Sequence, residues 1–236
     1  MSLAQSKRFY SEAGIAQSGG GYTIALDNRP VRTPAGAVLI LPMEPLAQAI
    51  CDEWAAQDEE IIPASMPIMQ LAVTAVERVA PARASVVERI AGYGASDLLC
   101  YRAEGPDDLV QRQKDNWQPL LDWAAENFGA ALTVTTGIIP IEQDEAALAA
   151  LGDAVEGHDD MELTALAEIA QICGSLVLGL AVTAGRLEWE AAFDASRLDD
   201  AWQAERWGKD GEDAARLVSL RRDLEAAVRF LSLARM

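Results

Sequence analysis

The chain has 236 residues, half of them hydrophobic and 24% charged, a composition typical of a folded globular protein rather than a disordered one. Its 37 acidic residues outnumber the 19 basic ones and give a formal net charge of −18. A surface of this sign repels the phosphates of nucleic acids and of anionic membranes, which argues against both as partners and leaves basic or apolar protein surfaces.

The first forty residues predict short strands joined by turns. Residues 22–26 (YTIAL) alternate in polarity, and residues 27–28 (DN) are a hairpin-turn pair. An earlier turn is predicted at residues 18–21 (SGGG) and a further strand at residues 37–41 (AVLIL). Pro30 lacks a ladder N–H, so its strand is expected at a sheet edge.

From residue 44 onward the hydrophobic period becomes that of a helix. Pro45 suits a first helical position, and Leu46, Ile50 and Trp54 recur every four residues on one face. We therefore expect Trp54 to have a structural role.

Two prolines within residues 61–67 (IIPASMP) mark the predicted domain boundary. It separates a β-rich domain at 1–66 from a mainly helical domain at 67–236. Residues 69–79 and 85–93 predict two helices separated by Pro81. A β-like run at 96–103 is expected to pair with residues 132–136. After residue 143 helices are expected over about 143–156, 159–184 with a break at Gly174, 187–207 and 211–234. The predicted fold class is α+β, with a small antiparallel β-rich N-terminal domain followed by a mostly α-helical C-terminal domain.

The three cysteines are widely spaced and form no Cys-x-x-Cys pair, which indicates reduced thiols rather than a disulfide framework or a zinc site. The N-terminal residues lack the apolar region of a secretory signal. The longest apolar run, residues 172–185, is shorter than the ~20 residues that span a bilayer. We expect a cytoplasmic protein in a bacterium, or a mitochondrial matrix protein if a eukaryotic presequence has been removed, with no membrane insertion.

The sequence contains no catalytic signature. Its one histidine, His158, lies in a polar stretch and is expected to be solvated, and no G-x-S-x-G elbow, P-loop or G-x-G-x-x-G accompanies it. No cofactor, no metal and no enzymatic activity are expected. Abundant carboxylates, as at residues 58–60 and 107–108, leave one alternative open, a hydrolase with two acids about 5 to 10 Å apart in a concave site.

Residues 198–210 (LDDAWQAERWGKD) place two tryptophans and a glutamate near the end of a predicted helix. On a helical wheel Trp202 continues an apolar stripe, Glu205 falls within the same arc, and Trp207 lies about 140° away. The two rings are expected to share a packing surface only if the helix ends between them, which Gly208 makes possible. Either Glu205 pairs with an arginine and Trp207 packs on the next helix, or both form a contact surface for a partner.

Several segments match one known family, in order and along nearly the whole chain. They are KRFY (7–10), LDNRPVRTP (26–34), LPMEPLAQAICDEWAAQ (41–57), IIPASMP (61–67), SDLLCYRAE (from 96), RQKDNWQPLLDWA (112–124) and SRLDDAWQAERWGKDGED (196–213). With these segments the chain resembles the ATP12 family, the assembly chaperones for the alpha subunit of the ATP synthase catalytic head. The resemblance implies a non-enzymatic protein that keeps the unassembled alpha subunit soluble until the beta subunit takes the place of the chaperone.

The resemblance also implies a site. The family's functionally sensitive acidic position, in a W-Q-x-E-x-W-G motif, corresponds to Glu205. Glu205 is therefore the expected charge contact to the alpha subunit, with Trp202 supporting it from the core and Trp207 and Asp210 flanking it. A monomer is expected. Arg29 and Arg32 are candidates for a second contact, but we interpret them as charges that protect a sheet edge.

Overall fold

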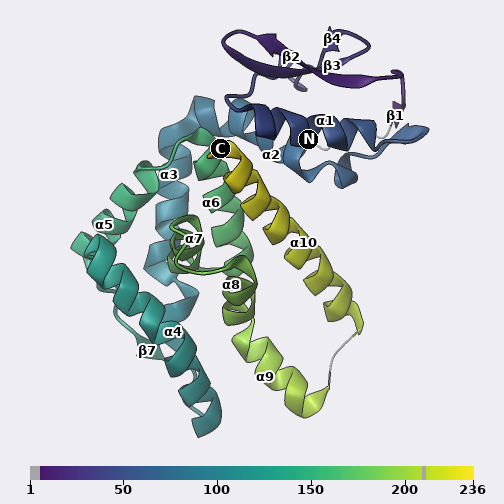
Figure 1. Cartoon of the computed structure of the whole chain (residues 1–236). Helices are drawn as coiled ribbons and strands as arrows, with labels where there is room; N and C mark the ends of the chain where they lie inside the picture. The colour runs from purple at the N-terminus through teal and green to yellow at the C-terminus, as the bar shows by residue number, and fades with distance from the viewer. Residues whose placement is uncertain (1–5, 209–210) are drawn as a thin grey trace. The chain divides into compact units, whose positions relative to one another are not determined.

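The computed structural model describes residues 6–208 and 211–236 (Figure 1). Within these ranges the chain forms two compact units. The N-terminal unit contains the chain up to Arg83 together with Asp160–Ala165 and Ala226–Met236, and the helical unit contains Ala84–Asp159 and Leu166–Glu225. The first holds an antiparallel sheet and the second is almost wholly helical, so the predicted α+β class is confirmed.

A three-stranded antiparallel sheet in the order β2-β3-β4 forms one layer of the N-terminal unit. Its strands are β2 (Ala13–Ser18), β3 (Gly21–Leu26) and β4 (Arg29–Pro30). As predicted, residues 22–26 form a strand, and Pro30 lies on the edge strand. A separate pair joins β1 (Ser6–Lys7) to β5 (Glu60–Ile61).

The predicted turn between β3 and β4 is confirmed at Asp27 and Asn28. Both residues have positive φ angles, 47° and 64°, as a tight hairpin turn requires. The Asp27 carboxylate also accepts hydrogen bonds from the backbone N–H groups of Ser11 and Glu12, at 3.0 and 2.9 Å. The aspartate therefore shapes its own turn and fixes the segment that leads into β2.

Residues 37–41 run extended beside the sheet but form only isolated bridges, not the continuous strand predicted. Tyr22 and Leu41 exchange two backbone hydrogen bonds, at 2.9 and 2.8 Å. Pro30 and Pro34 lack N–H groups on the neighbouring segment, which shortens the ladder that these residues can form.

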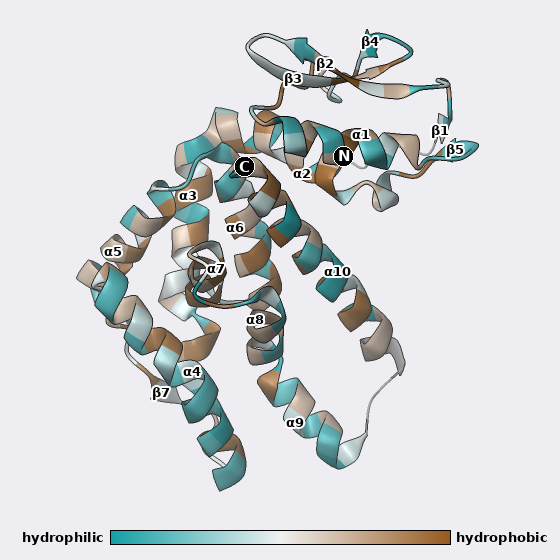
Figure 2. Cartoon of the chain, in the orientation of Figure 1, coloured by the Kyte–Doolittle hydropathy of each residue, from teal (hydrophilic) through white to brown (hydrophobic). Residues whose placement is uncertain are grey.

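Helix α1 (Glu44–Ala55) packs against β2 and β3 (Figure 1). It has Pro45 in its first turn, and Leu46, Ile50 and Trp54 are buried, as the helical period predicts. In Figure 2 hydrophilic and hydrophobic residues alternate along α1, so its apolar side supplies the core of the unit.

The helix α2 (Pro67–Thr74) belongs to the same core, because Ile68, Met69 and Ala72 are buried with α1. The division between the units therefore differs from the predicted boundary between residues 66 and 67. Each of the prolines that suggested a linker instead opens a helical turn, Pro63 in η1 (Pro63–Ser65) and Pro67 in α2.

Two helices were predicted on either side of Pro81, but the helical backbone continues through it. A π-helical turn, η2 (Ala75–Val79), and a 3-10 turn, η3 (Ala80–Ala82), join α2 to α3 (Arg83–Ala91). These turns accommodate a residue that has no N–H group for a regular α-helical bond.

The helical unit surrounds α7 (Leu176–Thr183), in which every residue is buried. The predicted break at Gly174 is confirmed by its φ of 64°. The predicted pairing of the two β-like runs is also confirmed, because β6 (Tyr101–Arg102) pairs with β7 (Thr135–Thr136), and the two strands are parallel. None of the helices in the described ranges is long and apolar enough to cross a membrane. The remaining elements are η4 (Gly92–Ser96), η5 (Leu98–Cys100), β6 (Tyr101–Arg102), α4 (Asp107–Phe128), β7 (Thr135–Thr136), α5 (Glu145–Glu156), α6 (Asp160–Cys173), α7 (Leu176–Thr183), α8 (Trp189–Ser196), α9 (Leu198–Trp207) and α10 (Gly211–Ala234).

Candidate functional site

The predicted site residues lie on α9, which packs against α4 within the helical unit. A single helix was expected over residues 187–207, but the chain turns at Arg197 and divides it into α8 and α9. The Arg197 guanidinium donates a 2.6 Å hydrogen bond to the Ile172 carbonyl near the end of α6, which anchors this corner. Gly208, with a φ of 88°, ends α9.

Trp202 is the buried centre of the site, with 5% of its surface exposed. Its indole Nε1 donates a 3.0 Å hydrogen bond to the Asp108 carboxylate on α4. The Arg206 guanidinium stacks 3.6 Å from the centroid of the Trp202 ring and forms an ion pair with the same carboxylate. One tryptophan thus joins the apolar face of α9 to the acidic first turn of α4.

A second ion pair connects the same two helices with the opposite polarity. The two terminal nitrogens of the Arg112 guanidinium, Nη1 and Nη2, each lie 2.9 Å from one carboxylate oxygen of Glu205, in a bidentate contact. Each helix therefore gives one acid and one base to its neighbour, Asp108 and Arg112 from α4 and Glu205 and Arg206 from α9. This reciprocal arrangement fixes the register of the two helices.

The ion pairs stabilise the charged forms of both acids. The hydrogen bond from Arg112 holds the pKa of Glu205 below its usual range. The Trp202 N–H, followed by Arg206, lowers the pKa of Asp108. The site therefore keeps its alternating charges at neutral pH.

A buried polar layer lies beneath these surface pairs. Gln113 is fully buried and donates a 2.8 Å hydrogen bond to Asp199 on α9, while its side-chain oxygen accepts one from the Ala103 N–H. Trp117 donates from Nε1 to the Ala195 carbonyl at 2.9 Å. These bonds tie α4 to α8 and α9, so the surface above them rests on a rigid base.

Trp207 is the exposed member of the site, with 74% of its surface accessible. Its ring meets Trp202 edge-on, with centroids 5.8 Å apart and planes at 80°. The expectation that the rings could meet only if the helix ended between them is wrong, because α9 continues through Trp207. Side chains on a helix lean toward its N-terminus, and a long indole on the last turn reaches back along the helix.

The structure thus brings together three of the four predicted residues, and Asp210 lies outside the described residues. Glu205 is paired with an arginine, as one interpretation proposed. Sequence reasoning missed Asp108 and Arg112 because they lie more than 90 residues from their partners. Their four-residue spacing on a predicted helix was the available signal, since such residues share a face.

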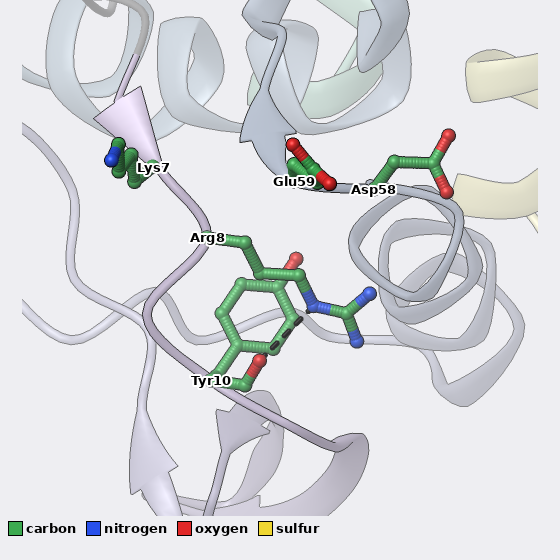
Figure 3. A pocket seen from close by; sticks show the side chains of 5 residues that line it. All are labelled: Lys7, Arg8, Tyr10, Asp58 and Glu59. Carbon is green, nitrogen blue, oxygen red and sulfur yellow. Dashed lines mark hydrogen bonds between the residues drawn. The ribbon is translucent and has the colours of Figure 1, made fainter.

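The carboxylates at residues 58–60 do not form the paired-acid site of the alternative hypothesis. Asp58 and Glu59 line a wide, open hollow with Lys7, Arg8 and Tyr10 (Figure 3). Their side chains are directed to different sides rather than converging, and the Arg8 guanidinium donates to three backbone carbonyls. The hydrogen bonds of Arg8 therefore give this hollow a structural role beside the β1–β5 pair.

No cluster of three or more histidine, cysteine or acidic residues in the described part of the chain is placed to hold a metal ion. His158 is half-buried rather than solvated as predicted. Its ring nitrogens lie 3.0 Å from the Ala154 carbonyl and 3.1 Å from the Thr183 hydroxyl, which gives it a structural position between two helices.

A family model described as ATP12 chaperone protein matches residues 7–125, half of the chain. The chain belongs to the ATP12 chaperone family. The model includes Asp108 and Arg112 on α4 but ends before α9.

Similar proteins extend this family assignment along nearly the whole chain. The crystal structure of Atp12 from Paracoccus denitrificans and the structure of a mutant of that protein each match with a TM-score of 0.93 and 43% identity, over 97% of this chain and 98% of the other. Atu1473, a putative chaperone from Agrobacterium tumefaciens, is 38% identical over 97% of this chain and 86% of its own, also with a TM-score of 0.93. Mitochondrial atp12 of Schizosaccharomyces pombe is 24% identical over 214 residues, 86% of this chain and 74% of the relative. This ATP12 family member is a chaperone.

Proposed function

We propose that this chaperone is a monomer that binds the unassembled alpha subunit of the ATP synthase catalytic head. It prevents aggregation of the alpha subunit until the beta subunit displaces the chaperone. A subunit of an alternating ring exposes apolar interface while it is alone, and such patches aggregate. Covering the patch requires no active site. The compartment is the one where the alpha subunit is assembled, the bacterial cytoplasm or the mitochondrial matrix.

The exposed Trp207 carries this proposal. A tryptophan with 74% of its surface accessible is a strong anchor for a protein partner, because large aromatic side chains dominate interface energetics. Its edge contact with the buried Trp202 holds the ring in place before binding. A side chain that is already ordered loses less conformational entropy in the complex.

The surrounding charges give the anchor a polar rim. The side chains of Arg112 and Glu205 remain 45% and 51% exposed although they are paired with each other. A basic side chain of the partner can therefore approach Glu205 from outside without a buried charge being left unpaired. Such rim contacts set register and association rate more than affinity.

The test is aggregation of isolated alpha subunit, followed by light scattering, with this protein and with its variants. The wild type should suppress scattering, and both Trp207→Ala and Glu205→Lys should suppress it less. Glu126→Lys is the matched control, because Glu126 is exposed and lies on α4 about 21 Å along the helix from Arg112. It should behave as the wild type.

A charge swap separates partner contact from internal support. In Arg112→Glu combined with Glu205→Arg, the α4–α9 ion pair can form again with reversed polarity. If Glu205 contacts the alpha subunit, the swap stays defective although the protein is folded. Full recovery in the swap would assign Glu205 to helix register alone, and a wild type that leaves scattering unchanged at molar excess would refute the proposed function.

A further inference from the structure

A groove in the N-terminal unit lies outside the α4–α9 site. It has a volume of about 300 Å³ and is lined by Phe9, Leu26, Arg29, Pro30, Val31, Arg32, Pro34, Trp54 and Met69. Ligand pockets begin at about this size. The groove is therefore large enough for one or two side chains.

The groove has an apolar floor and an aromatic lip. Leu26, Val31, Trp54 and Met69 are buried, between 2% and 8% exposed. Phe9 is 70% exposed, and its ring meets that of Tyr10 edge-on at 5.4 Å. An exposed phenylalanine over a preformed apolar floor is suited to closing against a large apolar side chain.

The rim is basic, in contrast to the rest of the protein. Arg29 and Arg32 are both exposed and line the groove. Residues 6–43 contain four basic residues against two acidic ones, a net charge of +2 in a chain whose net charge is −18. This basic surface complements carboxylates.

The backbone around the groove disfavours binding by strand addition. Pro30 on the edge strand β4 has no N–H to donate, and the Val31 carbonyl already accepts a 3.1 Å hydrogen bond from Leu39. Recognition must therefore come from side chains that enter the groove. A second copy of this chain is disfavoured as the occupant, because two proteins of net charge −18 repel each other.

We infer that this groove is a second client-binding site, which takes a segment of the unassembled alpha subunit that carries a large apolar side chain flanked by carboxylates. The apolar side chain lies on the floor between Trp54 and Phe9, and the carboxylates meet Arg29 and Arg32. The identity of the partner rests on the proposed function, whereas the chemistry of the segment rests on the groove.

The test uses peptides, so it does not depend on the alpha subunit. The probe is a fluorescently labelled hexapeptide, Glu-Glu-Phe-Leu-Glu-Glu, and binding to the full chain is followed by anisotropy. Two comparison peptides replace either the acids by lysines or the apolar pair by serines. Only the acidic, apolar probe should bind, and its binding should weaken as ionic strength rises.

Two variants locate the site, each with a control in the same unit. Arg29→Glu should weaken binding of the probe at least about fivefold, while Arg78→Glu, an exposed arginine outside the groove, should change it less than about twofold. Phe9→Ser should also weaken it, whereas Ile62→Ser, which removes another exposed apolar side chain, should not. Arg29 is preferred to Arg32 because Arg32 donates a 2.6 Å hydrogen bond to the Gly36 carbonyl.

The outcomes are distinguishable. Equal binding of the acidic and lysine probes, or equal effects of Arg29→Glu and Arg78→Glu, would overturn the groove assignment. Dimerisation of the free chain that Arg29→Glu abolishes would also overturn it, since the occupant would then be a second copy. Probe binding at the groove by a protein that leaves alpha-subunit aggregation unchanged would instead refute the proposed function and leave the groove's chemistry standing.

Discussion

Trp207 rests edge-on against Trp202, 5.8 Å between ring centroids, so that one fully packed indole supports one exposed indole on the same helix. Trp202 is 5% exposed and Trp207 is 74% exposed, although the two residues lie only five positions apart in the sequence. This pairing gives each tryptophan a different role, and substitution can separate the two roles.

Replacing Trp202 by alanine should destabilise the fold, whereas replacing Trp207 should not. Trp202→Ala removes a buried indole and its hydrogen bond to Asp108, and should lower the free energy of unfolding by about 3–5 kcal/mol. Trp207→Ala loses mainly one aromatic contact and should cost no more than about 1 kcal/mol. Urea denaturation of both variants measures the difference, and similar losses would contradict the roles assigned here.

Glu53 should make stability depend on pH near neutrality. Its carboxylate accepts 2.8 Å hydrogen bonds from the Ile68 and Met69 N–H groups at the start of α2, yet burial raises its pKa from 4.5 to about 7. A raised carboxyl pKa means that the folded state holds a proton that the unfolded state has released. The contribution of Glu53 to stability is then greatest below pH 4.5 and falls as pH rises to about 7.

The measurement compares the wild type with Glu53→Gln, which does not titrate. The stability of the wild type relative to this variant should fall by at most about 3 kcal/mol between pH 4.5 and 7, and stay constant above that range. Denaturation at a series of pH values gives the difference. A constant difference throughout would show that the two N–H bonds offset the effect of burial on the Glu53 pKa.

Asp97 should be among the most sensitive polar residues of the helical unit. It is fully buried, and its carboxylate accepts 3.0 Å hydrogen bonds from the Leu99 and Val177 N–H groups, so it caps two helical segments. Asp97→Ala leaves both donors buried without acceptors and should cost about 2–5 kcal/mol. Asp97→Asn keeps one acceptor oxygen and should cost less, and the ranking is checked by thermal denaturation of both variants.

Gly21 should not tolerate a side chain, whereas Gly14 in the paired strand should. A Cβ on Gly21 would lie 2.4 Å from the Leu41 carbonyl oxygen, which is held by its hydrogen bond from Tyr22. Gly21→Ala should therefore cost about 1–3 kcal/mol because backbone must move. A Cβ on Gly14 meets no atom within 4 Å, so Gly14→Ala is the control and should be nearly neutral. Equal unfolding midpoints would contradict this account.

Local chemistry made much of the fold predictable. The turn at Asp27 and Asn28, the proline that opens α1 and the glycine that separates α6 from α7 each act within a few residues. The prediction that Pro81 separates two helices was wrong. A π turn next to Pro81 lets the helical backbone continue although the proline has no N–H group to donate, and the neighbouring residues in the sequence do not reveal this.

The sequence alone determined the fold class, the family resemblance and the candidate cluster on residues 198–210, since these depend on composition, periodicity and local motifs. Tertiary structure decided which side chains face each other. Asp108 and Arg112 meet α9 only because α4 packs beside it, and Phe9, Arg29 and Met69 line one groove only because β4, α1 and α2 close around it. Contacts between distant segments depend on how packed faces align, and helical period specifies that a face is buried without specifying its partner.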